Sequence, residues 1–323
     1  PRWPATAAGF PFLFGTMPQI TANHLQFEYE SFGAESGPAI LLIMGLGAQL
    51  GRWNIELCEA LVRRGYRVVR FDNRDCGLSS KIDAAGVPDL GRALRIGVPL
   101  QDPPYTLEDM ATDCVCLLTA LGIERAHIVG ASMGGAIAQL VAALYPQRTL
   151  SLTSIMSTSS HPDLPPPTPA AAHALMAPLP ATRDRESLIE DAMTRQLAVA
   201  SPEYPSCPQR MRAQLVEEHE RGYYPRGVAR QLAAFLASGD RRALLATIQA
   251  PTLVLHGAED PLIPVACGHD VAAHIPGARM RVIEGMAHDF PLALTEVFVD
   301  AIDGVARKAG NRPETRPADT ICQ

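Results

Sequence analysis

The stretch H-I-V-G-A-S-M-G-G at 127–135 joins an apolar run to a helix-forming segment and contains the pattern G-x-S-x-G. Ser132 stands at its centre, with Gly130 two residues before it and Gly134 two residues after it. A strand that reverses this sharply into a helix strains its central residue and leaves no room for a side chain at either glycine. The serine hydroxyl is then exposed at the helix N-terminus, where the helix dipole and free amides favour developing negative charge. The pattern therefore predicts that Ser132 is a nucleophile.

The nucleophile needs two partners further along the chain. A serine hydroxyl is weakly nucleophilic at neutral pH, so it requires a neutral imidazole as base and a carboxylate that holds the imidazole. The order expected after a strand–turn–helix nucleophile is serine, acid, histidine. Asp260 follows the apolar run 252–256 in H-G-A-E-D-P, and His288 follows the run 279–284 in G-M-A-H-D. We therefore expect Asp260 to orient His288, and His288 to activate Ser132.

Neighbouring residues offer alternatives to these assignments. Glu259 adjoins Asp260 and is a second candidate for the acid, although the H-G-x-x-D-P spacing favours Asp260. Asp289 is expected to point away from His288 and to be solvated, and His256 to make a structural hydrogen bond. The sequence contains no H-E-x-x-H motif and no close cluster of histidines and carboxylates, so we expect no metal and no cofactor.

The oxyanion that forms during acyl transfer needs aimed hydrogen-bond donors. The amide of Met133 is one candidate, because it follows the nucleophile. The second is expected from the loop after A-I-L-L-I-M at 39–44, where Gly45-Leu46-Gly47 lets the backbone approach the site. We assign this second donor to the Leu46 amide. The alternative is that M-G-L-G is only a flexible turn.

Short apolar runs alternate with helix-length segments over most of the chain. Runs of this kind, bounded by turn residues, are typical of buried parallel strands. They predict strands at 39–44, 67–72, 127–131, 150–156, 252–256 and 279–284, after an opening hairpin within 20–32. The intervening segments predict helices at 53–64, 106–121, 133–144 and 292–307. The pattern therefore predicts an α/β fold with a mostly parallel sheet and helices on both faces.

A long interruption divides this alternation. Residues 157–242 begin with a proline-rich segment and continue with amphipathic stretches. A structureless loop of that length is implausible in a compact domain, so we predict a helical cap over the carboxyl edge of the sheet, where α/β proteins bind ligands. The core is then formed by 17–156 and 243–308. We interpret 1–16 as a leader or appended remnant, and 309–323 as a flexible tail.

Composition restricts the partners of this chain. The 323 residues carry a net charge of -6 and contain no Lys/Arg cluster that could follow a phosphate backbone, so nucleic acid is not expected. Apolar runs fall short of the roughly 20 residues that span a bilayer. The seven cysteines lack the spacing of a zinc site or a small disulfide scaffold, which favours free thiols and a cytoplasmic location. The oligomeric state is left open.

Taken together, the motifs resemble the α/β-hydrolase superfamily from about Ile20 to Ala306. They are G-A-S-M-G-G at 130–135, H-G-A-E-D-P at 256–261, G-M-A-H at 285–288 and F-D-N-R-D-C-G-L-S at 71–79. In the last of these, the resemblance implies structural roles for Asp72, Arg74 and Ser79. It also implies an eight-stranded, mostly parallel sheet flanked by helices, with a helical lid between strands six and seven.

One departure from the superfamily concerns substrate. Met44-Gly45 stands where many members have His-Gly, and this form resembles the aclacinomycin methylesterase-like hydrolases. The resemblance implies a carboxylic ester hydrolase that forms an acyl-enzyme on a small-molecule ester. Carbon–carbon bond hydrolysis, perhydrolysis, lipase activity and a receptor with slow turnover stay open as alternatives. Leu and Met residues along the predicted cap favour short to medium acyl groups.

Overall fold

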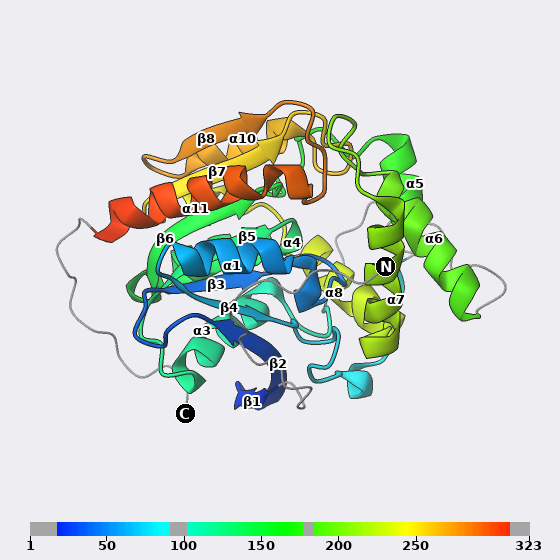
Figure 1. Cartoon of the computed structure of the whole chain (residues 1–323), viewed down its shortest axis with the longest axis horizontal. Coiled ribbons are helices and arrows are strands. Elements are labelled where there is room, and N and C mark those ends of the chain that lie inside the picture. Colours follow the sequence, from blue (N-terminus) through cyan, green and yellow to red (C-terminus); the bar gives the residue numbers. More distant parts are fainter. Residues whose placement is uncertain (1–17, 91–101, 177–183, 311–323) are drawn as a thin grey trace, which may run out of the picture.

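The computed structural model of the chain describes residues 18–90, 102–176 and 184–310. Their centre is one eight-stranded sheet with the order β1-β2-β4-β3-β5-β6-β7-β8 (Figure 1). The strands are β1 (Gln19–Ala22), β2 (Leu25–Phe32), β3 (Ala39–Ile43), β4 (Arg67–Phe71), β5 (Ala126–Ala131), β6 (Thr149–Ile155), β7 (Thr252–Gly257) and β8 (Arg279–Ile283). The first two strands form an antiparallel hairpin joined antiparallel to β4, and all later pairs are parallel. The predicted fold class is confirmed.

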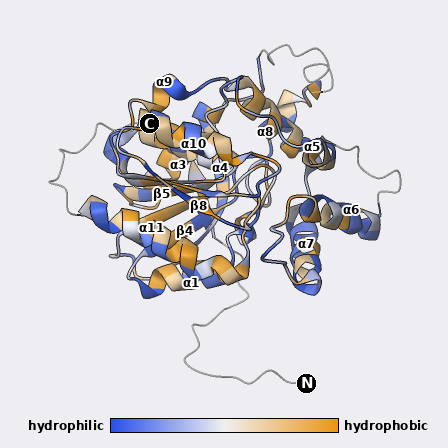
Figure 2. Cartoon of the chain, turned by 90° about the horizontal axis from the view of Figure 1, so that it is seen from above, coloured by the Kyte–Doolittle hydropathy of each residue, from blue (hydrophilic) through white to orange (hydrophobic). Residues whose placement is uncertain are grey.

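Helices cover both faces of the sheet (Figure 2). One face carries α1 (Ile55–Arg63) and α11 (Thr295–Gly310), and the other carries α3 (Leu107–Ala120), α4 (Met133–Leu144) and α10 (Val265–His274). Strands β3, β4, β5 and β7 therefore bury every side chain, which explains why most of the central strands are continuous apolar runs. The sheet thus separates two hydrophobic cores.

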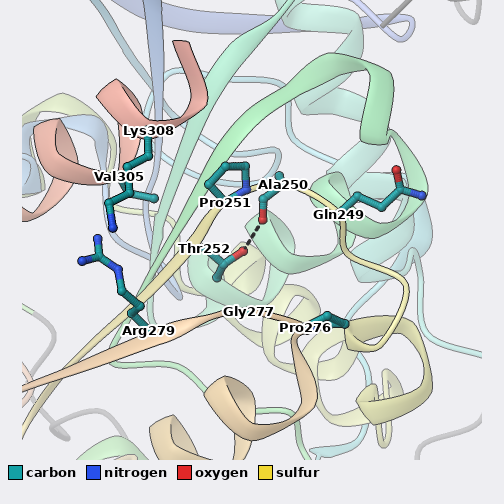
Figure 3. A pocket seen from close by; sticks show the side chains of 9 residues that line it. All are labelled: Gln249, Ala250, Pro251, Thr252, Pro276, Gly277, Arg279, Val305 and Lys308. Carbon is teal, nitrogen blue, oxygen red and sulfur yellow. Dashed lines mark hydrogen bonds between the residues drawn. The ribbon is translucent and has the colours of Figure 1, made fainter. Parts of the chain in front are cut away.

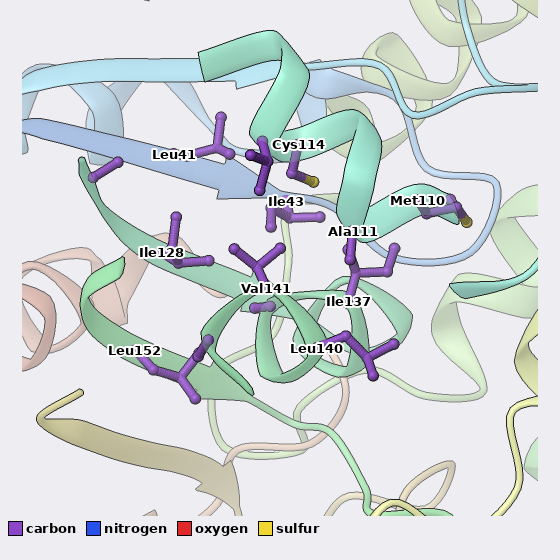
Figure 4. Close-up of a cluster of buried hydrophobic side chains, with 14 of the residues drawn as sticks. Leu41, Ile43, Met110, Ala111, Cys114, Ile128, Ile137, Leu140, Val141 and Leu152 are labelled. Atoms are coloured by element: carbon purple, nitrogen blue, oxygen red, sulfur yellow. The ribbon is translucent and has the colours of Figure 1, made fainter. Parts of the chain in front are cut away.

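Strand β3 shows how consecutive residues serve the two cores. Leu41 and Ile43 point toward α3 and α4 (Figure 4), while Ile40 and Leu42 join the cluster that includes α1 and α11. All four side chains are fully buried, and each contributes about 1.5–3 kcal/mol of transfer free energy to folding. Such two-sided burial holds the carboxyl ends of the strands in fixed positions.

Helix α10 was absent from the predicted elements. Its segment contains Gly268, and a glycine inside a helix lowers the helix propensity by about 1 kcal/mol relative to alanine. The structure explains this residue, because a Cβ added at Gly268 would lie 2.4 Å from Nδ1 of His256 on β7. The glycine allows the helix to approach the sheet closely. Close packing against β7, and not local helix propensity, accounts for the glycine at this position.

Between β6 and β7 the chain leaves the sheet, and we call residues 157–242 the cap. Its helices are α5 (Pro169–Met176), α6 (Arg185–Leu197), α7 (Pro208–Gly222) and α8 (Pro225–Ala237), followed by the short α9 (Arg242–Leu245). Helices α6 and α7 share a small hydrophobic cluster of Ile189, Met211 and Leu215. In both views α5, α6 and α7 lie beyond one end of the strands, with α8 between them and the sheet (Figures 1 and 2).

Buried ion pairs attach the cap to the turn that follows β4. Arg230 of α8 binds both carboxylate oxygens of Asp75, at 2.7 and 2.8 Å, and both side chains are fully buried. Arg221 of α7 binds Asp72 at 2.5 Å. Because an uncompensated buried charge is costly, these pairs fix the cap in one place on the core.

The turn at 71–79 is itself a hydrogen-bonded unit. Asp72 accepts the amides of Leu50 (2.8 Å) and Leu78 (2.9 Å), and its carbonyl accepts the hydroxyl of Ser79 at 2.6 Å. Arg74 binds Asp113 of α3 through two nitrogens, at 2.6 and 2.7 Å. The structural contacts that the resemblance implied for Asp72, Arg74 and Ser79 are present.

Some expectations require correction or lie beyond the described residues. Free thiols are found at Cys58, Cys76, Cys114, Cys207 and Cys267, but Cys116 is disulfide-bonded, so the expectation of free thiols was wrong at Cys116. A disulfide depends on two β-carbons lying about 4 Å apart in space, which spacing along the chain does not reveal.

Helix α11 extends to Gly310, past the predicted start of the tail at residue 309. The predicted leader 1–16 lies outside the described residues, as does the tail beyond Gly310. Within the described ranges, no helix combines the length and hydropathy needed to cross a bilayer.

Candidate active site

Ser132 occupies the sharp turn between β5 and α4. Its backbone has φ 57° and ψ −124°, a positive-φ conformation that is unusual for a residue with a side chain. The flanking glycines are required by contact: a Cβ at Gly130 would lie 2.0 Å from the Gly134 carbonyl oxygen, and one at Gly134 would lie 2.2 Å from that of Ile43. The turn therefore has the geometry predicted from G-x-S-x-G.

His288 lies between Ser132 and Asp260. Its Nε2 is 3.0 Å from the Ser132 hydroxyl oxygen, and its Nδ1 is 2.7 Å from Oδ2 of Asp260. The three residues follow β5, β7 and β8 at the carboxyl ends of these parallel strands, which meet at one edge of the sheet. Residues separated by as many as 156 positions are thus brought into one hydrogen-bonded chain.

Asp260 is buried, and both of its carboxylate oxygens have hydrogen-bond partners. Oδ1 accepts the amides of Leu262 (2.9 Å) and Ile263 (2.8 Å), while Oδ2 faces His288. Burial by itself raises the pKa of this carboxyl, but the charge of His288 and side-chain hydrogen bonds from His256 and His288 outweigh it and hold the pKa well below its usual range. The carboxylate therefore stays ionised, as a partner for an imidazolium must.

The structure distinguishes Asp260 and His288 from the neighbouring residues that were alternatives to them. Glu259 is exposed, and its amide binds the Met286 carbonyl, so Asp260 and not Glu259 faces the imidazole. Nε2 of His256 lies 2.7 Å from the Ile263 carbonyl oxygen, which is the structural hydrogen bond expected of it. Where the sequence sets two carboxylates side by side, burial distinguishes them.

The expectation of a solvated Asp289 was wrong. Its carboxylate is half-buried and accepts the backbone amide of Ser201 at 3.2 Å together with the Ser201 hydroxyl. Burial raises the pKa of Asp289, although its hydrogen bonds to Ser201 oppose the shift. Ser201 belongs to the cap and is 88 residues away in sequence, so no local signal indicated the contact.

The loop after β3 lies against the nucleophile. A Cβ added at Gly45 would be 3.0 Å from Cβ of Ser132. On the far side of Leu46, the Gly47 amide already donates to Oε1 of Gln231 at 2.8 Å. Met133 is the first residue of α4, where an amide has no acceptor within the helix. The positions of Leu46 and Met133 are thus compatible with donors to a common oxyanion.

A surface pocket lies at the other edge of the sheet (Figure 3). It is formed where β7 and β8 begin, next to the C-terminal end of α11. The lining residues are Gln249, Ala250, Pro251, Thr252, Pro276, Gly277, Arg279, Val305 and Lys308. It contains none of the residues predicted for catalysis, which all follow the carboxyl ends of strands. A search of the described ranges for three or more His, Cys, Asp or Glu side chains arranged to hold a metal found none.

Residues 38–292 match the family described as alpha/beta hydrolase fold. The chain therefore belongs to this family, and it is an α/β-hydrolase enzyme.

Among curated relatives, the chain is 28% identical over 308 residues to rhodomycin D methylesterase DauP of Streptomyces sp. strain C5, covering 90% of this chain and 98% of that one. It is 26% identical over 290 residues to 3-oxoadipate enol-lactonase 2 of Acinetobacter baylyi, covering 90% and 96%. Among solved structures, the enol-lactonase from Burkholderia xenovorans LB400 is similar in fold, with a TM-score of 0.69 and 23% identity over 90% of this chain and all of that one.

Proposed function

We propose that this chain is a carboxylic ester hydrolase that works through an acyl-enzyme on Ser132. The observation that carries the proposal is the position of His288, within 3.0 Å of the Ser132 hydroxyl on one side and 2.7 Å of Asp260 on the other. A base held between nucleophile and carboxylate is the arrangement that acyl transfer by serine requires.

The reaction follows from these positions. Nε2 of His288 takes the proton as Ser132 attacks the ester carbonyl, and the imidazolium is stabilised by the ionised Asp260. The Leu46 and Met133 amides stabilise the resulting oxyanion, and loss of such a donor typically costs about 3 kcal/mol. His288 then protonates the departing alkoxide. Water, activated by the same imidazole, attacks the acyl-enzyme and releases the acid.

The proposed substrate is a small-molecule ester with a short to medium acyl group. Support comes from a relative named as a methylesterase and another named as an enol-lactonase, each aligned over 90% of this chain. The cap also restricts the space: Cγ2 of Val228 on α8 lies only 2.7 Å from where a Cβ of Gly47 would stand. A cap helix this close to the loop after β3 favours small substrates. A cytoplasmic location remains a prediction from the sequence.

The test is turnover of p-nitrophenyl acetate, butyrate, octanoate and palmitate in monomeric solution, with burst kinetics to detect the acyl-enzyme. Ser132→Ala is expected to lower kcat/KM by more than about a thousandfold. Asp260→Asn is expected to lower it by about ten-thousandfold, because the imidazole loses its tautomer, and Glu259→Gln serves as the exposed control.

Three outcomes would contradict the proposal. Full activity of Ser132→Ala would exclude Ser132 as nucleophile, and a single turnover without release would indicate a receptor. An optimum at palmitate, or activation at an oil surface, would indicate a lipase.

A further inference from the structure

The backbone around His288 is held by the cap and not only by the sheet. The His288 amide donates to the Val199 carbonyl at 3.0 Å, and the preceding amide, of Ala287, donates to the Ser201 hydroxyl oxygen at 2.8 Å. Glu203 adds a third link, from its amide to the Gly285 carbonyl at 3.3 Å. The segment that follows α6 thus runs alongside the loop that carries the proposed base.

Ser201 is the centre of this contact. Its side chain is almost completely buried, its hydroxyl accepts from Ala287 and donates to Asp289, and its own amide donates to the same carboxylate at 3.2 Å. One residue therefore fixes the chain immediately before His288 and the side chain immediately after it. With both neighbours fixed, the imidazole has little freedom to move away from Ser132.

We propose that Ser201 is a positioning residue for His288, acting through the Ala287 amide and the Asp289 carboxylate. The inference rests on the proposed function, since it assigns a role toward the proposed base. It follows that the cap helps to position the proposed base. A movement of the cap that separates residues 199–203 from residues 285–289 also displaces His288.

The precision with which a reacting group must be positioned sets the loss of rate that we expect from Ser201→Ala. A displacement of about 1 Å of a reacting group lowers the rate by about a hundredfold. Ser201→Ala removes the acceptor of the Ala287 amide and one donor to Asp289, while it keeps the backbone link. We therefore expect kcat to fall about 10- to 100-fold with little change in KM.

The matched control is Ser187→Ala, which removes a comparable serine–aspartate contact in the same cap. The Ser187 hydroxyl donates to Asp184 at 2.9 Å in an exposed position at the start of α6. This control should keep kcat within about twofold of the wild type. Asp289→Asn, which keeps the shape of the side chain, gives a second measurement if Ser201→Ala does not fold, and it should also lower kcat about tenfold. Unchanged kcat in a folded Ser201→Ala or Asp289→Asn variant would overturn the inference.

A double-mutant cycle with His288→Ala tests whether the effect runs through the base. Removing one member of a triad leaves measurable catalysis by the oxyanion donors, roughly 10³- to 10⁴-fold over water. If Ser201 acts through His288, then Ser201→Ala has no further effect in the His288→Ala background. An equal loss in both backgrounds would show a general structural role and overturn the inference. Full activity of His288→Ala itself would instead contradict the proposed function, so the two failures are distinguishable.

Discussion

Gln231, on the cap helix α8, accepts the amide hydrogen of Gly47 at 2.8 Å, and its own amide group donates to the Arg74 carbonyl at 2.7 Å. The Gln231 side chain is completely buried. Gly47 ends the loop that faces Ser132. At the start of this loop, Nδ2 of Asn73 donates to the Met44 carbonyl at 2.8 Å. A residue of the cap and a residue of the turn after β4 therefore fix the two ends of the loop that follows β3, which is the proposed source of the Leu46 oxyanion donor.

Replacing Gln231 with Met should lower kcat and weaken the binding of a transition-state analogue such as a boronic acid by a similar factor. The change leaves the Gly47 amide and the Arg74 carbonyl unpaired, at a cost of about 1–3 kcal/mol each if both stay buried. We expect about a tenfold loss of kcat, which corresponds to about 1.4 kcal/mol. Gln214→Met on α7, which removes an exposed hydrogen bond to Gly51, is the control. A loss of analogue affinity without a loss of kcat would contradict the prediction.

The acid side of the pH profile should report a single titrating group. Because the pKa of Asp260 is held below its usual range, this carboxyl stays ionised while the base is protonated. On the acid limb, the plot of log(kcat/KM) against pH should therefore fall with a slope of no more than one. A slope of two would mean that acid and base titrate together.

The same shift has a consequence for stability. A carboxyl with a depressed folded pKa stabilises the fold above its unfolded pKa of about 4, and this contribution is lost as the pH falls toward the folded pKa. The difference in unfolding free energy between the wild type and Asp260→Asn should therefore shrink below about pH 4. Urea unfolding across this range measures it, and a difference that grows on acidification would contradict the assignment.

The strained turn predicts an unusual order of stabilities at position 132. A residue at φ 57° and ψ −124° adopts a conformation that glycine favours, and such strain costs about 1–3 kcal/mol. Ser132→Gly should therefore be more stable than Ser132→Ala by about 1 kcal/mol. At Ser187, in the first turn of α6, the order should be reversed, with alanine the more stable replacement by up to about 1 kcal/mol. If thermal unfolding gave the same order of stability for the glycine and alanine variants at both positions, backbone strain at Ser132 would be contradicted.

The buried pair of Arg230 and Asp75 should dominate the attachment of the cap. Arg230→Met leaves Asp75 as an uncompensated buried charge and should lower the free energy of unfolding by about 3–5 kcal/mol. Arg210→Met, which breaks an exposed pair with Glu56 at 2.8 Å, should cost less than about 1 kcal/mol. Equal effects of the two replacements in denaturant unfolding would show that the buried pair is not the main link.

Local patterns were sufficient for much of the sheet and for the order of the site residues. Buried parallel strands are continuous apolar runs, so the segments at 39–44, 127–131 and 252–256 indicated strands within a residue or two of β3, β5 and β7. The elbow around Ser132 was visible because its glycines are neighbours in the chain. Helix α10 was missed because Gly268 weakens the local helix signal. The glycine is required by close packing against His256, a contact that sequence periodicity does not encode.

By itself, the sequence determined the fold class, the strand-to-helix turn at Ser132 and the candidates Asp260 and His288, because each depends on residues within a few positions of one another. Only the tertiary structure decided that Glu259 is exposed while Asp260 is buried, and that Asp289 binds Ser201. It also decided that Gln231 takes the Gly47 amide, 184 residues away. These contacts form when the cap folds back onto the carboxyl edge of the sheet, and a hydrogen bond between such distant segments leaves no period or spacing in the chain.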